Sequence, residues 1–581
     1  MNKKKYQDAL YEVRRIRDLR ELIHSSAELF GYRAAFLIKD KPGGEYQPVS
    51  YIQMLSDMNG LGTALLNRGF GGQKIAIVAE NRYEWVLSYF AVCCGTGIFV
   101  PIERELTKED IKNLLMRSGA TAVFFSSKTK DLVDEATQDQ GEGVQKINMD
   151  LADHQEGTWS FRRLIEEGRS LLEAGNTDYL NATIDPEVMS LLLFTSGTTG
   201  TAKGVMLSHK NLVSNVMNMS MYVNVYGFVG LSVLPMHHTY EMTCHILTSV
   251  YQGCTVAICE GLKHITKNMA EAKVTVMLGV PLIFEAMYKR IMKQAQKSGK
   301  SKKMSRAIAL SKKLHLTNTN LPRKIFKEVH DAIGGEMKLL ISGAAAMDPE
   351  IIENFCAMGL PMMQGYGMTE CSPIIAVNRD RYSKAASVGT AMPNTEIKII
   401  DPDENGIGEI ICRSDSVMLG YYDDPEETSK VLKDGWLHTG DYGYFDDDKY
   451  LYITGRKKNV IVTKNGKNIF PEEVEFHLGK SDYILESLVY GIDEQCGGET
   501  MVCAQIVPDY QAIEEEFGQL TDHEIRKLVK GAVDQANDQM PLYKRVKRFE
   551  IRNTEFEKTA SKKIKRHVAR QGGVEDGSQR I

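Results

Sequence analysis

The sequence predicts an α/β protein with a large N-terminal domain of α/β subdomains, a small β-rich subdomain and a small C-terminal α+β domain. Between residues 19 and 125, helix-like and strand-like segments alternate, which is typical of a mostly parallel sheet. Between residues 387 and 453, short strands and turns replace that alternation. The chain has 581 residues, more than one hydrophobic core easily serves, so two or more domains are expected.

The individual elements follow from the spacing of apolar residues. This spacing predicts helices over residues 19–30, 51–66 and 107–119, and one that opens at residue 79 and ends near Gly95. It predicts strands over residues 74–78, 97–100, 122–125, 189–194, 229–234 and 338–341, and in the β-rich part over 396–400, 408–412, 440–445 and 450–454. Residues 131–185 are polar and acidic, and we expect a variable surface region there.

The composition is that of a globular protein and indicates neither nucleic-acid binding nor a zinc or disulfide framework. Hydrophobic content of 43% and charged content of 25% are ordinary for a globular protein, and a net charge of −5 gives no reason to expect nucleic acid as a partner. Ten cysteines without paired metal spacing indicate neither a zinc site nor a disulfide framework. The longest apolar stretch, residues 85–102, is interrupted by Ser88, Gly95 and Gly97, so it predicts a core helix and a strand. We expect a cytoplasmic protein.

A loop of small residues follows the strand expected at residues 189–194. Residues 195–204 read Thr-Ser-Gly-Thr-Thr-Gly-Thr-Ala-Lys-Gly. Glycines let backbone N–H groups approach an anion, hydroxyls add donors, and Lys203 adds a positive charge. The loop is not a P-loop, because Ala202 stands where that motif needs its second glycine. A plain Gly/Thr turn is the alternative. The length of the motif favours a nucleotide-phosphate loop formed by Thr195, Ser196, Gly197, Thr198, Thr199, Gly200 and Lys203.

This stretch resembles the signature of the adenylate-forming superfamily, which includes acyl-CoA synthetases, peptide-synthetase adenylation domains and luciferases. The commonest family form has proline in place of Ala202. Two later motifs resemble the same superfamily, in the same order: Gln-Gly-Tyr-Gly-Met-Thr-Glu at residues 364–370 and Gly-Trp-Leu-His-Thr-Gly-Asp at residues 435–441. The resemblance covers nearly the whole chain and is closest to the long-chain fatty-acid acyl-CoA synthetases.

The resemblance implies a site for ATP and Mg²⁺, and the residue types fit it. Tyr366 offers an aromatic face to adenine, and Asp441 offers two oxygens to the ribose hydroxyls. Thr369 offers a hydroxyl to the α-phosphate, and Glu370 offers Mg²⁺ a hard oxygen ligand. Thr195 is implied as a second metal-binding and catalytic residue. Small residues leave room for a flat base, which adds Gly343, Ala344, Ala345, Gly365 and Gly367 to the nucleotide site.

Further residues are implied by the resemblance alone. His238, in Leu-Pro-x-x-His-x-x-Glu at residues 234–241, borders the acyl and thiol-acceptor channels. Its alternative is a helix-capping histidine. Arg456 contacts ribose or phosphate, and Lys458 takes the position of the interdomain hinge. The loop around Gly466 meets the pantetheine arm of coenzyme A.

The adenylation lysine is assigned to Lys563. Residues 557–564, Glu-Lys-Thr-Ala-Ser-Lys-Lys-Ile, resemble the family's Pro-Lys-Thr-x-x-Gly-Lys-Ile, with Glu557 and Lys562 as departures. The neighbouring Lys562 and Lys565 remain alternatives, as does a plain basic C-terminal helix. The implied domains are an N-terminal adenylation domain, residues 1–455, with its β-rich subdomain at about 376–455, a mobile C-terminal domain, residues 456–570, and a disordered tail, residues 571–581.

The expected reaction is ATP-dependent activation of a medium- to long-chain fatty acid to acyl-AMP with release of pyrophosphate, followed by transfer to coenzyme A. Two alternatives stay open: an enzyme that loads a carrier protein or adenylates an aryl or amino acid, and a non-catalytic acyl or nucleotide binder. The expected partners are fatty acid, ATP and coenzyme A, in a monomer or homodimer. Residues 289–327 are rich in Lys and Arg and predict a solvated helical insertion, with weak peripheral membrane contact as the alternative.

Overall fold

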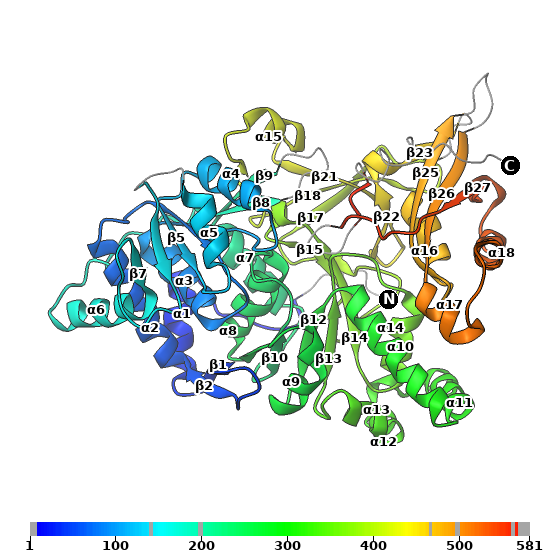
Figure 1. Ribbon diagram of the computed structural model, residues 1–581, viewed down its shortest axis with the longest axis horizontal. Coiled ribbons are helices and arrows are strands. Elements are labelled where there is room, and N and C mark those ends of the chain that lie inside the picture. The colour runs from blue at the N-terminus through cyan, green and yellow to red at the C-terminus, as the bar shows by residue number, and fades with distance from the viewer. Residues whose placement is uncertain are drawn as a thin grey trace.

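The computed structural model describes residues 9–138, 143–195, 202–463, 468–493, 500–558 and 564–566. Two mostly parallel sheets and the helices around them form the larger part of the molecule, in blue to green in Figure 1. Smaller sheets, in yellow to orange, lie beside them and lead to the C-terminal end. The predicted fold class, a large α/β part followed by a small C-terminal part, is confirmed.

The first sheet is parallel through its centre and antiparallel at one edge, where a hairpin adds to it. In spatial order it contains β19 (Gly420–Tyr421), β9 (Lys203–Ser208), β8 (Met189–Thr195), β4 (Ile98–Pro101), β3 (Lys74–Val78), β5 (Ala122–Phe125), β6 (Gln145–Asn148) and β7 (Thr158–Ser160). The central strands β3 and β5 are almost wholly buried, which is why they read as continuous apolar runs.

The second sheet is also mostly parallel, with antiparallel strands at both edges. In spatial order it contains β16 (Thr390–Ala391), β15 (Ile374–Val377), β14 (Met362–Gly367), β13 (Leu339–Ser342), β12 (Val276–Gly279), β10 (Val229–Ser232), β11 (Thr255–Ile258), β1 (Ala34–Ile38) and β2 (Gln47–Ser50). The N-terminal strands β1 and β2 therefore belong to a sheet that is otherwise built from the middle of the chain.

Helices accompany both sheets, and side-chain caps set where several of them begin. The Ser208 side chain accepts a hydrogen bond from the Asn211 N–H, and the Asn211 side chain accepts one from the Ser208 N–H. This capping box begins α7 at the N-cap that the sequence predicted, Ser208. The helices of this part are α1 (Leu19–Phe30), α2 (Tyr51–Asn67), α3 (Tyr83–Ala91), η2 (Val92–Thr96), α4 (Lys108–Ser118), α5 (Lys130–Thr137), α6 (Phe161–Glu173), α7 (His209–Ser220), η4 (Tyr240–Leu247), α8 (Thr248–Gln252), η5 (Leu262–His264), α9 (Ile265–Glu271), α10 (Pro281–Lys297), α11 (Ser301–Lys313), η6 (Leu316–Asn318), α12 (Leu321–Ile325), α13 (Lys327–Ala332) and α14 (Pro349–Ala357).

An antiparallel sheet forms the predicted β-rich part. It contains β17 (Glu396–Ile400), β18 (Gly408–Arg413), β21 (Trp436–Phe445), β20 (Leu432–Lys433) and β22 (Leu451–Arg456), with the short helix α15 (Pro425–Val431) before β20. Strand β22 ends at Arg456, and the single turn η8 (Lys457–Asn459) leads the chain out of this sheet. The remaining residues form the C-terminal part.

The C-terminal part has a hydrophobic core of its own, centred on residues such as Val474, Val502 and Val529. Its elements are β23 (Ile461–Val462), β24 (Asn468–Ile469), α16 (Pro471–Leu478), β25 (Ile484–Asp493), β26 (Thr500–Pro508), α17 (Tyr510–Phe517), α18 (Asp522–Asp538), η9 (Leu542–Lys544) and β27 (Arg548–Ile551). A separate core is the mark of a unit that can move as one body.

Most expected elements are found close to their expected bounds, with three differences. The strand expected over residues 440–445 is longer and begins at Trp436, as β21. The helix expected from residue 79 begins at Tyr83, and its last turn widens into the π-helix η2. Residues 131–185 are more ordered than expected, because β6 and β7 extend the first sheet and α6 packs against α2. None of the helices in the described ranges is long and apolar enough to cross a membrane.

Candidate active site

A cavity of about 1890 Å³ opens where the parallel strands of both large sheets end. Ligand sites of open α/β sheets lie at this carboxyl edge. The volume exceeds the roughly 1,000 Å³ of a large single-ligand pocket. The predicted residues that line the cavity are Thr195, Lys203, His238, Gly343, Ala344, Gly365, Gly367, Thr369, Glu370, Arg456 and Lys458. The sequence motifs, which are far apart in the chain, therefore meet in one place.

Asp441 connects the second and third motifs to the end of β22. The Tyr366 hydroxyl donates a hydrogen bond to Asp441 Oδ2 at 2.7 Å, and Arg456 Nε lies 2.9 Å from Asp441 Oδ1. Asp441 and Arg456 are paired across β21 and β22, which fixes their approach. Burial, and then the charge of Asp441, raises the pKa of Tyr366, while Asp441 raises the pKa of Arg456. The tyrosine therefore stays a donor and the arginine a cation.

Glu370 is held by a tyrosine from a distant turn. It lies in the single turn η7 (Thr369–Cys371), and Tyr421 donates its hydroxyl to Glu370 Oε1 at 2.9 Å. Burial, and then the charge of Glu370, raises the pKa of Tyr421, so this hydroxyl keeps its proton. The N–H of Met418 donates to the Glu370 carbonyl at 2.9 Å and fixes the backbone. Glu370 keeps lone pairs that a cation such as Mg²⁺ can use, together with substrate phosphates.

Lys203 begins β9, directly opposite Thr195 at the end of β8. Its ammonium group pairs with Glu427 of α15 and lies 4.9 Å from the centre of the Tyr421 ring. Hydrogen bonding to Lys203, and then to Lys430, lowers the pKa of Glu427 to about 2. In this state the lysine therefore already has an anionic partner beside the predicted phosphate loop.

The turn after β13 is shaped by close packing. A side chain on Gly343 would lie 2.7 Å from the Tyr240 ring, and the Tyr240 hydroxyl donates to the Ile341 carbonyl at 3.1 Å. The glycine thus makes room for a tyrosine of η4. Ala344 follows with φ of 71°, a left-handed conformation that costs energy for an L-residue and that concentrates at functional turns.

His237 and His238 lie beside each other at the cavity wall. Their ring centres are 4.2 Å apart, and His237 Nε2 lies 4.0 Å from Glu103 Oε2. Burial, and then the neighbouring His238, lowers the pKa of His237 far below its ordinary value, so His237 is neutral. His238 lines the cavity just before η4.

The interior of the cavity is apolar. Side chains of the second sheet, of α7 and of the segment between α7 and β10 line it, and many belong to one buried cluster. They are Met219, Val223, Val225, Val276, Leu278, Ile341, Met363, Ile374 and Val377. An apolar limb that continues from a polar end suits a hydrocarbon chain with a polar head.

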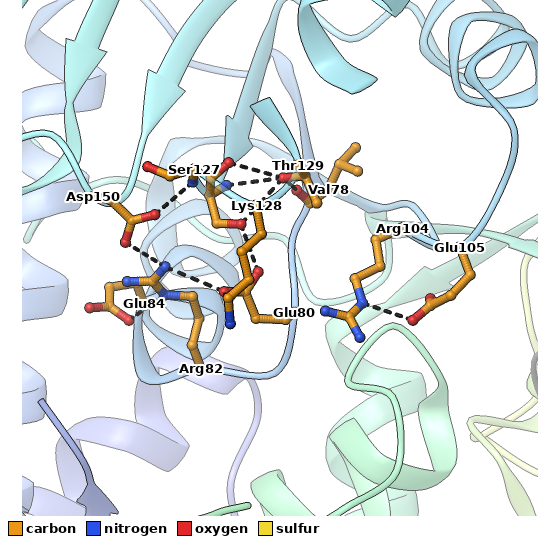
Figure 2. Close-up of polar contacts among 11 residues, drawn as sticks. Val78, Glu80, Arg82, Glu84, Arg104, Glu105, Ser127, Lys128, Thr129 and Asp150 are labelled. Atoms are coloured by element: carbon orange, nitrogen blue, oxygen red, sulfur yellow. Dashed lines mark hydrogen bonds and ion pairs between the residues drawn. The ribbon is translucent and has the colours of Figure 1, made fainter. Parts of the chain in front are cut away.

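The mouth of the cavity carries charges from the loops after β3, β4 and β5. The side chain of Lys128 is 74% exposed and that of Arg104 is 40% exposed. The ion pairs of this rim, drawn in Figure 2, join Arg82 to Glu84 and Asp150 at 2.8 Å each, Lys128 to Glu80 at 3.4 Å, and Arg104 to Glu105 at 2.8 Å. The cavity therefore presents charge to solvent and apolar surface within.

Not all of the predicted site residues are found in the cavity lining. Ala345, Tyr366 and Asp441 are not among the residues that line the cavity. Ala345 is exposed next to Ala344, and Asp441 is buried with its carboxylate paired to Arg456, which does line the cavity. The residues Ser196, Gly197, Thr198, Thr199, Gly200, Gly466 and Lys563 lie outside the described residues. Of the C-terminal lysines that are described, Lys558 and Lys565 line the cavity.

Sequence reasoning missed Tyr421 and Glu427. Tyr421 lies in the two-residue strand β19, and Glu427 in α15, which begins with Asp424 as a cap and Pro425. Both belong to a segment without a motif, 51 residues after Glu370 and 224 residues after Lys203. The pairing of β19 with β9 and the bond from the Met418 N–H to the Glu370 carbonyl bring them to the site.

Residues 24–422 match the family described as AMP-binding enzyme, and residues 458–576 match the AMP-binding enzyme C-terminal domain. The chain belongs to the AMP-binding enzyme family. The resemblance stated from the motifs is therefore confirmed.

Relatives within this AMP-binding family are similar over most of the chain. Mus musculus long-chain-fatty-acid–CoA ligase 5 is 30% identical over 81% of this chain and 72% of its own. Arabidopsis thaliana peroxisomal long chain acyl-CoA synthetase 7 is 29% identical over 84% of this chain and 74% of its own. The crystal structure of the anthranilate CoA ligase AuaEII with anthranoyl-AMP has the same fold, with a TM-score of 0.74 and 19% identity over 98% of this chain and 99% of that chain.

Proposed function

We propose that this AMP-binding enzyme activates a medium- to long-chain fatty acid with ATP and transfers the acyl group to coenzyme A. The observation that carries the proposal is the single cavity in which nucleotide anchors adjoin an apolar limb. The long-chain acyl-CoA synthetases and ligases among its relatives support the same reaction. The enzyme would be an AMP-forming acid–thiol ligase that uses ATP, Mg²⁺ and coenzyme A.

The first step overcomes the poor reactivity of a carboxylate. A carboxylate oxygen of the fatty acid attacks the α-phosphorus of ATP, the bond to the β-phosphate breaks, and pyrophosphate leaves with the electron pair. Lys203 and Lys563 would neutralise negative charge that develops in this step, and Glu370 and Thr195 would hold Mg²⁺, which polarises the phosphate. Thr369 would donate to the α-phosphate.

The nucleoside would be held by the connected group of Tyr366, Asp441 and Arg456. The ring of Tyr366 would pack beside the base, and Asp441 would accept from the ribose hydroxyls with the lone pairs that its bonds to Tyr366 and Arg456 leave. Two bonds already orient the carboxylate, so little conformational freedom is lost on binding. This pre-orientation supports Asp441 as the ribose anchor.

In the second step the thiol of coenzyme A attacks the acyl carbonyl carbon, and AMP leaves. Exposed Arg104 and Lys128 at the mouth would attract the phosphates of coenzyme A. We assign to Lys458 the hinge that moves between the two steps. We assign to the loop around Gly466 the contact with the pantetheine arm of coenzyme A. The separate core of the C-terminal part supports its movement as a unit.

The ion pairs made by the basic stretch, residues 289–327, favour a structural role for it over membrane contact. Lys293 of α10 lies 2.5 Å from Glu515 of α17, and Lys289 lies 3.6 Å from Asp482, so α10 faces the C-terminal part. Lys300 and Lys312 also have acidic neighbours, Glu328 at 2.6 Å and Glu353 at 2.9 Å.

An ATP–pyrophosphate exchange screen across fatty, aryl and amino acids tests the proposal. The expected result is exchange that depends on fatty acids and rises from acetate to medium and long chains. Exchange that peaks with acetate, an aromatic acid or an amino acid would contradict the proposed substrate. A lack of exchange with every acid would favour a non-catalytic binder.

A further inference from the structure

A row of lysines on α10 faces an acidic surface of the C-terminal part. Lys289, Lys293 and Lys297 are spaced four residues apart, so they lie on one face of the helix. Lys293 Nζ lies 2.5 Å from Glu515 Oε2 of α17, and Lys289 Nζ lies 3.6 Å from Asp482 Oδ1. Figure 1 shows α17 beside α10. The opposite face of α10 is buried in the larger, N-terminal part, so these two ion pairs join the two parts of the molecule.

The two surfaces carry opposite charge, and their contact is weak enough to open. Residues 289–297 include four Lys or Arg and no acidic residue, whereas α17 carries three consecutive glutamates at residues 514–516. A hydrogen bond from Lys293 lowers the pKa of Glu515, so the carboxylate is ionised. The four paired side chains are between 50% and 79% exposed. Exposed ion pairs contribute little free energy and are screened by salt, so this contact can break and re-form during a reaction cycle.

The acidic surface belongs to the same unit as the lysines that reach the active-site cavity. Ile513 of α17 lies in the hydrophobic core of the C-terminal part. Lys558 is fixed to that part by its ion pair with Glu486 of β25, and both Lys558 and Lys565 line the cavity. The structure therefore combines the contact between α10 and α17 with C-terminal lysines placed at the cavity. A rotation of the C-terminal part would end both arrangements together.

We propose that Lys289 and Lys293 are positioning residues for the first step: they hold the C-terminal part where its lysines reach the cavity, and their contact with α17 opens before the thiol attacks. This inference rests on the proposed function, because it assumes two steps with different placements of the C-terminal part. Lys289 and Lys293 do not line the cavity, so they act on the reaction only through the C-terminal part. Loss of the contact should therefore slow the formation of acyl-AMP and leave the transfer from acyl-AMP intact.

The test measures the two half-reactions separately in a charge-reversed variant. Lys289→Glu/Lys293→Glu should form acyl-AMP from hexadecanoic acid and ATP about threefold to tenfold more slowly than the wild type, because repulsion replaces two exposed ion pairs. Its conversion of supplied acyl-AMP and coenzyme A to thioester should equal or exceed the wild-type rate. Lys300→Glu/Lys312→Glu is the matched control, because it reverses two charges of the same basic stretch whose acidic partners belong to the N-terminal part. The control should keep the wild-type ratio of the two rates.

A charge exchange separates positioning from a loss of stability, since the ratio of the two rates does not depend on how much of a variant is folded. Asp482→Lys/Glu515→Lys should also slow acyl-AMP formation alone, and combining it with Lys289→Glu/Lys293→Glu should restore most of the rate. A ratio that does not change in the charge-reversed variant, or that the charge exchange does not restore, overturns the inference. Acyl-AMP formation by the wild type shows that the proposed function survives such a result. A wild-type enzyme that forms no acyl-AMP overturns both.

Discussion

The Tyr366 hydroxyl donates to Asp441 Oδ2 at 2.7 Å, and this bond joins the strand β14 to the strand β21. Arg456 Nε occupies the other carboxylate oxygen at 2.9 Å. Each oxygen has two lone pairs, so one on each remains for a ligand. The proposed nucleotide anchor is thus prepared by groups from three different segments.

Removing the Tyr366 hydroxyl tests this anchor. Tyr366→Phe should raise KM for ATP about fivefold, because one hydrogen bond contributes about 1 kcal/mol. Tyr452→Phe is the matched control, since it removes a tyrosine–aspartate hydrogen bond of the same small sheet, to Asp446. Equal changes in KM for ATP in both variants would contradict the role of Tyr366.

Glu370 is expected to act on nucleotide chemistry and to contribute little to folding. Glu370→Gln should lower kcat by a factor on the order of 100 or more, because it removes the charge that holds the metal. Its Tm should stay close to that of the wild type. Steady-state kinetics and thermal unfolding check both, and an active Glu370→Gln enzyme would return this residue to a structural role.

In the proposed reaction, Lys203 would exchange its ion pair with Glu427 for a phosphate when ATP binds. Glu427→Gln should therefore lower KM for ATP by a few-fold, since the nucleotide no longer competes with a carboxylate. Glu426→Gln is the matched control, because Glu426 lies on the same helix and pairs only with Lys430, at 2.8 Å, among the described cations. A raised KM for ATP in Glu427→Gln alone would show that Glu427 helps to position the lysine.

The roles of the C-terminal lysines can be distinguished by assaying the two half-reactions separately. Lys563→Ala should lose acyl-AMP formation by a factor on the order of 100 to 1,000, yet convert supplied acyl-AMP to thioester. Gly466→Leu should do the reverse, because a bulky side chain would obstruct the thiol. Lys565→Ala is the informative comparison, since Lys565 lines the cavity. Loss of adenylation in Lys565→Ala instead of Lys563→Ala would move the assignment.

Much of the fold was predictable because local signals suffice for it. Helix α1 and strands β3 and β5 have the bounds that apolar spacing predicted, and Ser208 caps α7. The order of the strands within each sheet was not predictable. Pairing such as β1 with β11 depends on contacts between segments far apart in the chain.

Site residues that stand in a sequence motif could be predicted. Site residues that are brought in by tertiary packing could not. The residues Glu370, Asp441 and Lys203 stand in motifs, but their partners Tyr421 and Glu427 do not. The hydrogen-bonded pair Glu241 and His245 has ordinary helical spacing, and the spacing alone does not reveal that both side chains are buried. Burial of polar groups is a property of the tertiary structure, which a single sequence does not reveal.

The most direct test of the account is the identity of the products. Purified enzyme with hexadecanoic acid, ATP, Mg²⁺ and coenzyme A should form AMP, pyrophosphate and acyl-CoA in equal amounts, and should form acyl-AMP when coenzyme A is left out. Direct formation of ADP and orthophosphate, with no acyl-AMP in the absence of coenzyme A, would contradict it.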